Sequence, residues 1–419
     1  MKVLISAFAC QPNRGSDYGV GWAWATKLAK MGHEVWVITW SNNQPQIERE
    51  LKTNSISNLH FIYCKDATWV CKAYQFVGAI RIPLGSAVVW NFSCTWWQWD
   101  AYQLAKSLHE EIVFDVVHHV TNTSVRRCSF MGFLNIPFIF GPLAGGVKAP
   151  LSLRKGYPFI GKFIDSIRDF NNSLVKFDPL MHLSFAKATK IYCDSKPTQA
   201  LIPKLYQDKS EVLFSMPSYE ISQSDRLVEN STVKDFFQVL FVGRFLYWKG
   251  IHLGLQAFAR LHDKFPNSRF TLIGKGPQAD WLQRLSEQLG IEKAVDWIPW
   301  MEQKELDSIY IQHDVLLFPS LHDSGGMVVI EALSKGLPTI CLDLGGPGTI
   351  VDETCGQVVK TNKLSEERVV RSLGNALTEL ADNSQLLQQL SVGASARPRK
   401  FAFDRVVQHV YDKDIGRSL

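Results

Sequence analysis

Short apolar runs alternate with longer amphipathic stretches along most of the chain. Runs of this length predict buried strands, and the amphipathic stretches between them predict helices, the first from about residue 20 to residue 31. A first series of expected strands covers residues 3–9, 34–39, 61–64, 116–120, 137–140 and 190–193. A second series covers residues 237–241, 269–273, 294–298, 315–318, 338–342 and 356–359. Strands and helices in alternation predict an α/β protein with doubly wound parallel sheets.

Residues 217–236 interrupt this pattern with a polar stretch that has no clear period, which is typical of a linker. The break predicts an N-terminal Rossmann-like domain over residues 1–216 and a C-terminal one over residues 217–399. Two copies of one architecture imply a central crevice between them, where a ligand is expected to bind.

Composition narrows the class of protein. The chain has 419 residues, 46% of them hydrophobic, and a formal net charge of +5. This charge is too weakly positive for a nucleic-acid binder and favours small anions or an anionic membrane surface as partners. The eight cysteines form no C-x-x-C pair and no zinc spacing, so we expect no metal and a reducing, cytoplasmic setting. The apolar start has no cleavage-site pattern, and no stretch approaches the roughly 20 apolar residues of a membrane span.

Two cations follow the first strand of the second series, in the segment FVGRFLYWKG at residues 241–250. Arg244 and Lys249 come after Gly243, at the carboxyl end of a strand that is expected to be central. Arg can bind a diphosphate through two hydrogen bonds, and Lys adds a point charge. The alternative is an ordinary solvated basic loop.

Two carboxylates lie near the start of a helix that is expected to begin at about Met327. Asp323 lies in the preceding turn, and Glu331 lies inside the helix. The turn between them contains Ser324, Gly325 and Gly326. Carboxylates at this position can accept hydrogen bonds from vicinal sugar hydroxyls. The alternative is an acidic residue that complements the helix dipole, together with a surface glutamate.

Two glycine-rich turns follow strands. The first, QPNRGSDYGVG at residues 11–21, contains Gly15 and opens a helix whose N-terminus can attract a phosphate, although it can also be a plain tight turn. The second starts at Gly274, reads GKGPQA and is followed by Asp296, which matches the nicotinamide fingerprint. This match lies in the middle of its series rather than at the first turn, so an oxidoreductase is the less favoured interpretation.

A pair of histidines, His118 and His119, ends a strand of the first domain. A single histidine at such a position is more often structural, but two beside a crevice make a catalytic role as plausible as a structural one. The sequence does not decide which of the two would face a ligand.

With these motifs in view, the chain resembles the retaining glycosyltransferases of family 4, which have the GT-B fold. The resemblance covers nearly the whole chain and is strongest over residues 238–360. The segments that carry it, besides residues 241–250, are FTLIGKGP at 270–277, FPSLHDSGGMVVIEALSKGLP at 318–338, DLGGPG at 343–348 and RPRKFAF at 397–403. In the family, the last segment leads into a helix, here about residues 400–419, that crosses back to the first domain.

The resemblance implies a role for each candidate residue. Arg244 and Lys249 would hold the donor diphosphate, Glu331 the ribose hydroxyls and Asp323 the transferred sugar. The glycine-rich turns and the Ser324–Met327 region would approach the donor; they contribute Gly15, Gly243, Gly274, Ser324, Gly325, Gly326 and Met327. One of the two strand-end histidines would lie near the donor sugar. No metal or other cofactor is implied, and the donor would be a UDP- or GDP-sugar.

The sequence departs from the family pattern at three places. Asp323 stands where the family usually has a longer Glu, which puts the donor preference in doubt. The turn after it lacks the common aromatic residue, and residues 215–218 replace the usual Asn-Gly pair. The expected function is therefore transfer of a sugar, with retention of configuration, to a saccharide or lipid-linked acceptor in polysaccharide or glycolipid assembly. The alternatives are a sugar-nucleotide epimerase, a nicotinamide enzyme and a silent sugar-nucleotide binder.

Two further stretches favour a peripheral position on the cytoplasmic membrane face. Trp90, Trp96, Trp97 and Trp99 fall close together with Phe92, and tryptophan favours membrane interfaces. The alternative is an aromatic lining of an acceptor pocket.

The second stretch, residues 159–174, has an apolar stripe at helical spacing: Phe159, Ile160, Phe163, Ile164, Ile167, Phe170 and Leu174. Cations lie off the stripe or just before it: Lys162, Arg168, Lys176, Arg154 and Lys155. A basic amphipathic helix of this kind is typical of an interfacial anchor. Asp165 and Asp169 dilute the positive face, and the alternative is a stripe that packs on the protein's own core.

Overall fold

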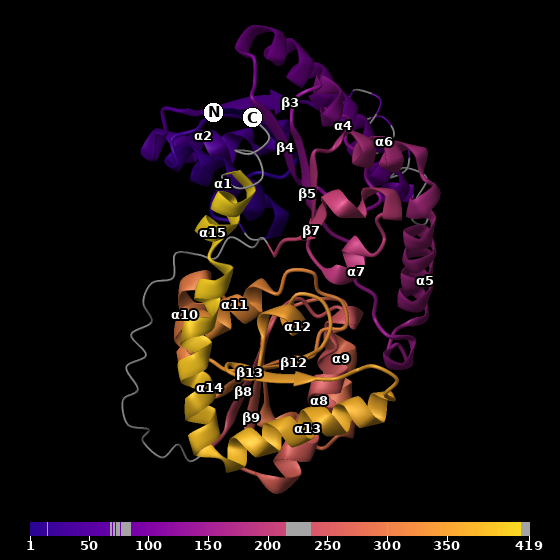
Figure 1. The fold of residues 1–419 in the computed structure, drawn as a ribbon. Coiled ribbons are helices and arrows are strands. Elements are labelled where there is room, and N and C mark those ends of the chain that lie inside the picture. The colour runs from indigo at the N-terminus through magenta and orange to yellow at the C-terminus, as the bar shows by residue number, and fades with distance from the viewer. Residues whose placement is uncertain are drawn as a thin grey trace. The chain divides into compact units, whose positions relative to one another are not determined.

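The protein consists of two compact α/β units, each built on a parallel sheet, in the computed structural model (Figure 1). The structure describes residues 1–14, 16–67, 69, 72, 76, 85–214, 236–299 and 301–411. The first unit comprises Met1–Gly146, Phe170–Pro217 and Phe403–Leu419, and the second comprises Val147–Asp169 and Ser218–Ala402.

The first unit contains a seven-stranded sheet in the order β3-β2-β1-β4-β5-β6-β7, with all neighbours parallel. Its strands are β1 (Lys2–Ala7), β2 (Glu34–Trp40), β3 (Leu59–Cys64), β4 (Val116–Thr121), β5 (Phe138–Leu143), β6 (Lys190–Cys193) and β7 (Ser210–Val212). Its helices include α1 (Ser16–Lys30), α2 (Gln44–Thr53), α4 (Gly85–Ile112), α6 (Pro179–Lys187), α7 (Lys196–Gln199) and α15 (Phe403–Gln408). Because β1 and β4 are buried along nearly their whole length, the sheet is covered on both faces, as parallel sheets are.

The second unit contains a six-stranded parallel sheet in the order β10-β9-β8-β11-β12-β13. Its strands are β8 (Gln238–Val242), β9 (Arg269–Ile273), β10 (Val295–Ile298), β11 (Val315–Phe318), β12 (Thr339–Leu342) and β13 (Gly356–Val359). Its helices are α8 (Ile251–Lys264), α9 (Ala279–Gln288), α10 (Gln303–Gln312), α11 (Met327–Ser334), α12 (Pro347–Ile350), α13 (Glu366–Asp382) and α14 (Ser384–Ala396). The predicted pair of doubly wound parallel sheets is confirmed.

Two features of the chain path were not expected from the sequence, and the third follows the crossing of the C-terminal segment that the resemblance implies. The short strand β7 extends the first sheet beyond β6. Val147–Asp169, expected in the first domain, packs with the second unit, and the boundary falls within helix α5 (Phe159–Leu174). Residues 403–411 pack in the core of the first unit, with Trp24 against Phe403. The expected linker lies almost entirely outside the described residues.

Each sheet reverses its strand order at one place, between β1 and β4 in the first and between β8 and β11 in the second. The loops that leave two such strands diverge to opposite sides of the sheet, so they leave room for a ligand at the carboxyl ends of the strands. The segment with Arg244 and Lys249 (the cation segment) follows β8, and the turn with Asp323 (the acidic turn) follows β11. The histidine pair, His118 and His119, lies on β4. The fold thus brings these motifs to the two order reversals.

Candidate functional site

The predicted cations lie in the loop after β8. Arg244 is exposed to solvent, whereas Lys249 ends a short 3-10 turn, Tyr247–Lys249, and has a side chain that is 19% exposed. The Lys249 ammonium contacts the Asp323 carboxylate and lies 5.1 Å from the centre of the Phe318 ring. The structure therefore brings Lys249 and Asp323 together, although they are far apart in the sequence.

Asp323 lies in the turn between β11 and α11. Its Oδ1 accepts hydrogen bonds from the backbone N–H groups of Gly325 and Gly326, at 3.3 and 3.1 Å, while Oδ2 contacts Lys249. Gly326 is the N-cap of α11, so the carboxylate occupies backbone donors at the positive end of that helix. The turn thus has its donors arranged for an anion, and the Asp323 carboxylate accepts from them.

The loops after β8 and β11 are joined through their backbones as well. The N–H of Leu321 donates to the carbonyl of Trp248 at 2.8 Å. The cations and the acidic turn therefore form one structural group rather than two independently moving loops.

Glu331 lies in the second turn of α11 and is half-buried. It accepts a hydrogen bond of 3.1 Å from the hydroxyl of Tyr310, a residue of α10 that is completely buried. Burial and the neighbouring Glu331 carboxylate hold the pKa of Tyr310 well above its usual value, so the hydroxyl keeps its proton and remains a donor. Tyr310 fixes one oxygen of Glu331. No pattern in the sequence pointed to Tyr310, since the contact joins two different helices.

The glycines of the apparent nicotinamide fingerprint have a packing role. A Cβ on Gly274 would lie 1.9 Å from the carbonyl oxygen of Gly243, and one on Gly276 would lie 2.5 Å from that of Phe245. These glycines let the loop after β9 lie directly against the loop after β8. Asp296, the expected ribose partner in that interpretation, pairs with Arg269 at 3.5 Å and is half exposed. The structure thus accounts for the fingerprint without a dinucleotide.

A third loop, between β12 and α12, holds the acidic turn from the other side. Gly345 has a φ of +59°, and a Cβ there would lie 2.0 Å from the carbonyl oxygen of Asp323. The N–H of Gly346 donates to that same carbonyl at 2.9 Å. The DLGGPG segment thus supports the Asp323 turn, which explains why glycines are required in it.

The two histidines of β4 are both completely buried, with no side-chain exposure. The ring of His118 has a partner at each nitrogen: Tyr411 Oη lies 3.1 Å from Nδ1, and the Gly141 carbonyl lies 2.8 Å from Nε2. This is the environment of a core histidine. His119 bonds only to the Thr121 carbonyl, at 3.1 Å from Nε2, and its Nδ1 is buried without a hydrogen-bond partner among the described residues.

Burial lowers the pKa of His118 to about 4 and that of His119 to about 3, so both rings are neutral at physiological pH. The free nitrogen leaves His119 as the better candidate for a catalytic role. The sequence could not make this choice, because only the tertiary structure brings Tyr411 to β4.

Gly15 lies outside the described residues. The glycines that follow it on α1 are packing positions. A Cβ on Gly19 would lie 2.1 Å from the carbonyl of Arg14, and one on Gly21 would lie 2.2 Å from that of Ala9. The backbone of this turn is therefore closely packed, as an anion-binding strand-to-helix turn requires, and its role in binding stays a prediction.

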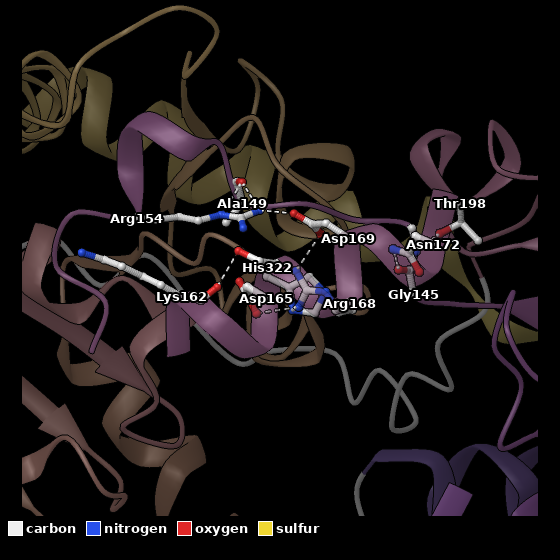
Figure 2. Close-up of polar contacts among 12 residues, drawn as sticks. Gly145, Ala149, Arg154, Lys162, Asp165, Arg168, Asp169, Asn172, Thr198 and His322 are labelled. Atoms are coloured by element: carbon white, nitrogen blue, oxygen red, sulfur yellow. Dashed lines mark hydrogen bonds and ion pairs between the residues drawn. The ribbon is translucent and has the colours of Figure 1, made fainter. Parts of the chain in front are cut away.

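A largely buried network of ion pairs joins residues 147–169 to the turn that contains His322 and Asp323 (Figure 2). Arg154 pairs with Asp169 at 2.5 Å, and Arg168 pairs with Asp165 at 3.2 Å. Arg168 also lies 3.3 Å from Nδ1 of His322, the residue before Asp323. Burial and the Arg168 charge lower the pKa of His322 to about 4, so its neutral ring can accept from the guanidinium. Sequence reasoning placed these arginines on the surface, and that placement is wrong.

In the part of the chain that the structure describes, no group of three or more His, Cys, Asp or Glu side chains is arranged to hold a metal ion. Within the same residues, no helix is both long and apolar enough to cross a bilayer.

The two Rossmann-like sheets, with charged and glycine-rich loops at the order reversals, define the GT-B class of glycosyltransferase folds. A model of the family described as "Glycosyl transferases group 1" matches residues 224–392, which lie in the second unit.

Two curated relatives match part of the chain. The D-inositol 3-phosphate glycosyltransferase of Corynebacterium urealyticum is 38% identical over 186 residues, 43% of this chain and 42% of that protein. The glycogen synthase of Mycobacterium tuberculosis is 29% identical over 160 residues, 38% of this chain and 37% of that protein. The chain thus spans about two fifths of the length of these relatives.

The fold likeness extends over the whole chain. The Anabaena protein HepE, solved in complex with UDP and glucose, superposes with a TM-score of 0.61 over 100% of both chains, at 15% identity. At this identity the superposition shows the shared fold alone.

Proposed function

We propose that this protein is a retaining hexosyltransferase that moves a sugar from a nucleotide diphosphate to an acceptor hydroxyl. The observation that carries the proposal is the grouping of Lys249, Asp323 and the N-terminal donors of α11 on adjoining loops at the β8–β11 reversal. A nucleotide-sugar donor presents both kinds of partner that these groups need: a diphosphate for the cation and N–H groups, and hydroxyls for the carboxylates.

Departure of the diphosphate is the step these residues would assist. The bond between the sugar carbon and the diphosphate breaks, and negative charge collects on the leaving group. Lys249 and Arg244 would stabilise that charge, together with the N–H groups of Gly325 and Gly326. The acceptor hydroxyl would attack from the face that the diphosphate leaves and pass its proton to the leaving phosphate, which retains the configuration.

The carboxylates would orient the donor. Glu331, held by Tyr310, would accept hydrogen bonds from the ribose hydroxyls, and Asp323 would contact the transferred sugar once Lys249 turns to the diphosphate. The cations and backbone donors supply the neutralisation that a metal gives in other enzymes, so we propose a reaction without a metal cofactor.

The donor that we propose is a UDP-sugar, because the Anabaena protein of the same fold was solved with UDP and glucose. A GDP-sugar is the alternative. We further propose that the acceptor is a saccharide or lipid-linked sugar in polysaccharide or glycolipid assembly, handled in the cytoplasm.

A binding panel followed by product analysis tests the proposal. Thermal shifts are measured with UDP-, GDP- and ADP-sugars and with NAD; a ligand at 100 times its dissociation constant stabilises the fold by about 2.7 kcal/mol. For a donor that binds, the anomeric configuration of the product is then read by proton NMR, and retention is expected. Stabilisation by NAD alone would point to an oxidoreductase, and donor binding without transfer or hydrolysis would point to a silent binder.

A further inference from the structure

Helix α5 has its apolar side toward solvent. The stripe predicted from the sequence is exposed along its whole length, from 85% at Phe159 through 53% at Phe163 to 63% at Phe170. The other members are exposed as well: Ile160, Ile164, Ile167 and Leu174. A surface helix of a globular protein normally buries its apolar stripe in the core. We call these seven side chains the outer face of α5.

The opposite side of the same helix is polar and is the side that packs on the protein (Figure 2). Asp165 is 1% exposed and Asn172 is completely buried, with the amide of Asn172 donating to the Gly145 carbonyl at 2.9 Å. Arg168 lies between them in ion pairs with Asp165 and Asp169. Because the ion pairs fix this polar side inward, the outer face is held outward and cannot turn to cover itself.

Acidic and basic side chains of residues 150–187 also differ in where they lie. Between residues 150 and 187 the acidic side chains all have partners within the protein: Asp165 and Asp169 lie in the ionic network, and Asp178 caps α6. The fully exposed charged side chains in this range are all lysines: Lys155, Lys162, Lys176 and Lys187. The two aspartates that were expected to dilute the positive charge are therefore paired with arginines, and their side chains are 1% exposed at Asp165 and 20% at Asp169.

The residues on either side of α5 also have exposed apolar side chains. Leu151 and Phe177, just before and just after α5, are each 79% exposed. An apolar strip with lysines beside it matches a bilayer surface, where apolar side chains enter the acyl boundary and lysines meet anionic headgroups. A protein partner would need an apolar groove with acidic rims, and a second copy of this chain would bring its own lysines against these.

We infer that the outer face of α5 docks this protein on an anionic lipid surface, with Lys155, Lys162 and Lys176 in contact with the headgroups. This surface is the partner that a transferase acting on lipid-linked sugars would need, and in that respect the inference rests on the proposed function. The docking itself requires neither donor nor turnover.

Vesicle flotation of the full chain tests the inference, with phosphatidylcholine vesicles with and without phosphatidylserine. We expect the wild type to float with the anionic vesicles and less so at high salt, because salt screens the lysines. Replacing Phe159, Phe163 and Phe170 by serine should abolish flotation. Replacing Lys155, Lys162 and Lys176 by glutamine should lower the partition coefficient roughly a hundredfold, at about fivefold for each lysine.

Matched controls separate docking from general charge and from folding. A triple control variant removes the same charge from exposed positions elsewhere and should leave flotation unchanged. It combines Lys264→Gln, Lys293→Gln and Lys400→Gln. Thermal melts of the serine variant should match the wild type, because its three side chains are exposed.

Three outcomes would overturn the inference: wild type that stays at the bottom with anionic vesicles at low salt, flotation that survives in the serine variant, or a dimer in sedimentation that the serine variant abolishes. None of these bears on sugar transfer, which is measured separately with a water-soluble acceptor.

Discussion

At the residue scale, the contact between Lys249 and Asp323 is the central feature of the candidate site. The two side chains are 19% and 17% exposed, and Asp323 also accepts from the N–H groups of Gly325 and Gly326, just before α11. The carboxylate therefore contacts both the cation and the N–H groups that a diphosphate would need. Donor binding is expected to separate the pair, leaving Lys249 to the diphosphate and Asp323 to the sugar.

Replacing Lys249 or Arg244 by alanine should reduce transfer far more than stability. Each charged contact to the leaving group is worth about 2–4 kcal/mol in the transition state, so kcat/KM should fall a hundredfold or more. Steady-state kinetics and thermal melts measure the two effects. Lys264→Ala, on the exposed end of α8, is the matched control. Near-normal turnover in both folded variants would show that the diphosphate lies elsewhere.

Glu331→Ala should raise the KM for the donor with a smaller effect on kcat, because a hydrogen bond to the ribose is made in both the ground and transition states. Tyr310→Phe tests the same contact from the other side. It removes the hydroxyl that fixes one Glu331 oxygen and should give a smaller rise in KM. Titration of each variant with the donor checks this. An unchanged affinity after Glu331→Ala would remove Glu331 from the ribose site.

Asp323→Glu should change the preference among donor sugars. The longer side chain moves the carboxylate outward by one methylene, which shifts its contact with the sugar hydroxyls. Competition between two sugars on one nucleotide gives the ratio of their kcat/KM values. A ratio equal to that of the wild type would mean that Asp323 does not contact the sugar.

At the element scale, α5 is held in place by charge rather than by an apolar core. Its inward side carries Asp165, Arg168 and Asp169, and Arg154 reaches Asp169 from the preceding loop. Removing one member of a buried ion pair leaves its partner without compensation, which is costlier than replacing both.

Arg168→Met alone should therefore destabilise the second unit by about 3 kcal/mol, at the low end of the range for buried pairs because the side chain is 16% exposed. The double variant Arg168→Met with Asp165→Leu should recover part of that loss. Thermal or urea unfolding of these two variants and of Asp165→Leu alone measures the coupling. If the double variant is destabilised by the sum of the two single changes, the pair does not act as a unit.

At the scale of the whole molecule, burial of neutral histidines predicts acid sensitivity. Burial lowers the pKa of His118 and His252 to about 4 and that of His119 to about 3, against an ordinary value of 6.5. The unfolded chain binds these protons near pH 6.5, but the folded chain does not bind them until the pH is near 4. Their contribution to stability is therefore complete above pH 6.5 and is lost as the pH falls toward 4.

Each such histidine should lower the free energy of unfolding by about 1.4 kcal/mol for every unit of pH below 6.5. Melting temperatures between pH 7.5 and pH 5 measure this, in a window above most carboxylate titrations. His118→Asn should flatten the profile of the first unit, because it removes one histidine whose folded pKa lies well below its ordinary value. A flat wild-type profile over this window would contradict the prediction.

The sequence alone determined the strands of both sheets, except the short β7, and the loops that carry the candidate residues. Buried strands need apolar side chains at nearly every position, so their positions can be recognised locally. Once the strands are recognised, the motifs at their ends can be located, such as the segment that contains Arg244 and Lys249. The resemblance to glycosyltransferases was recognised from these same segments, and a model of the group 1 glycosyl transferases matches residues 224–392.

Only the tertiary structure decided which partners these residues have. An apolar stripe on α5 is the same in sequence whether it faces the core or solvent, and its direction depends on ion pairs with residues outside the helix. The same holds for His118, whose nitrogens are occupied by Gly141 and Tyr411. Contacts between segments far apart along the chain leave no local pattern, because each partner can satisfy its own segment's periodicity without the other.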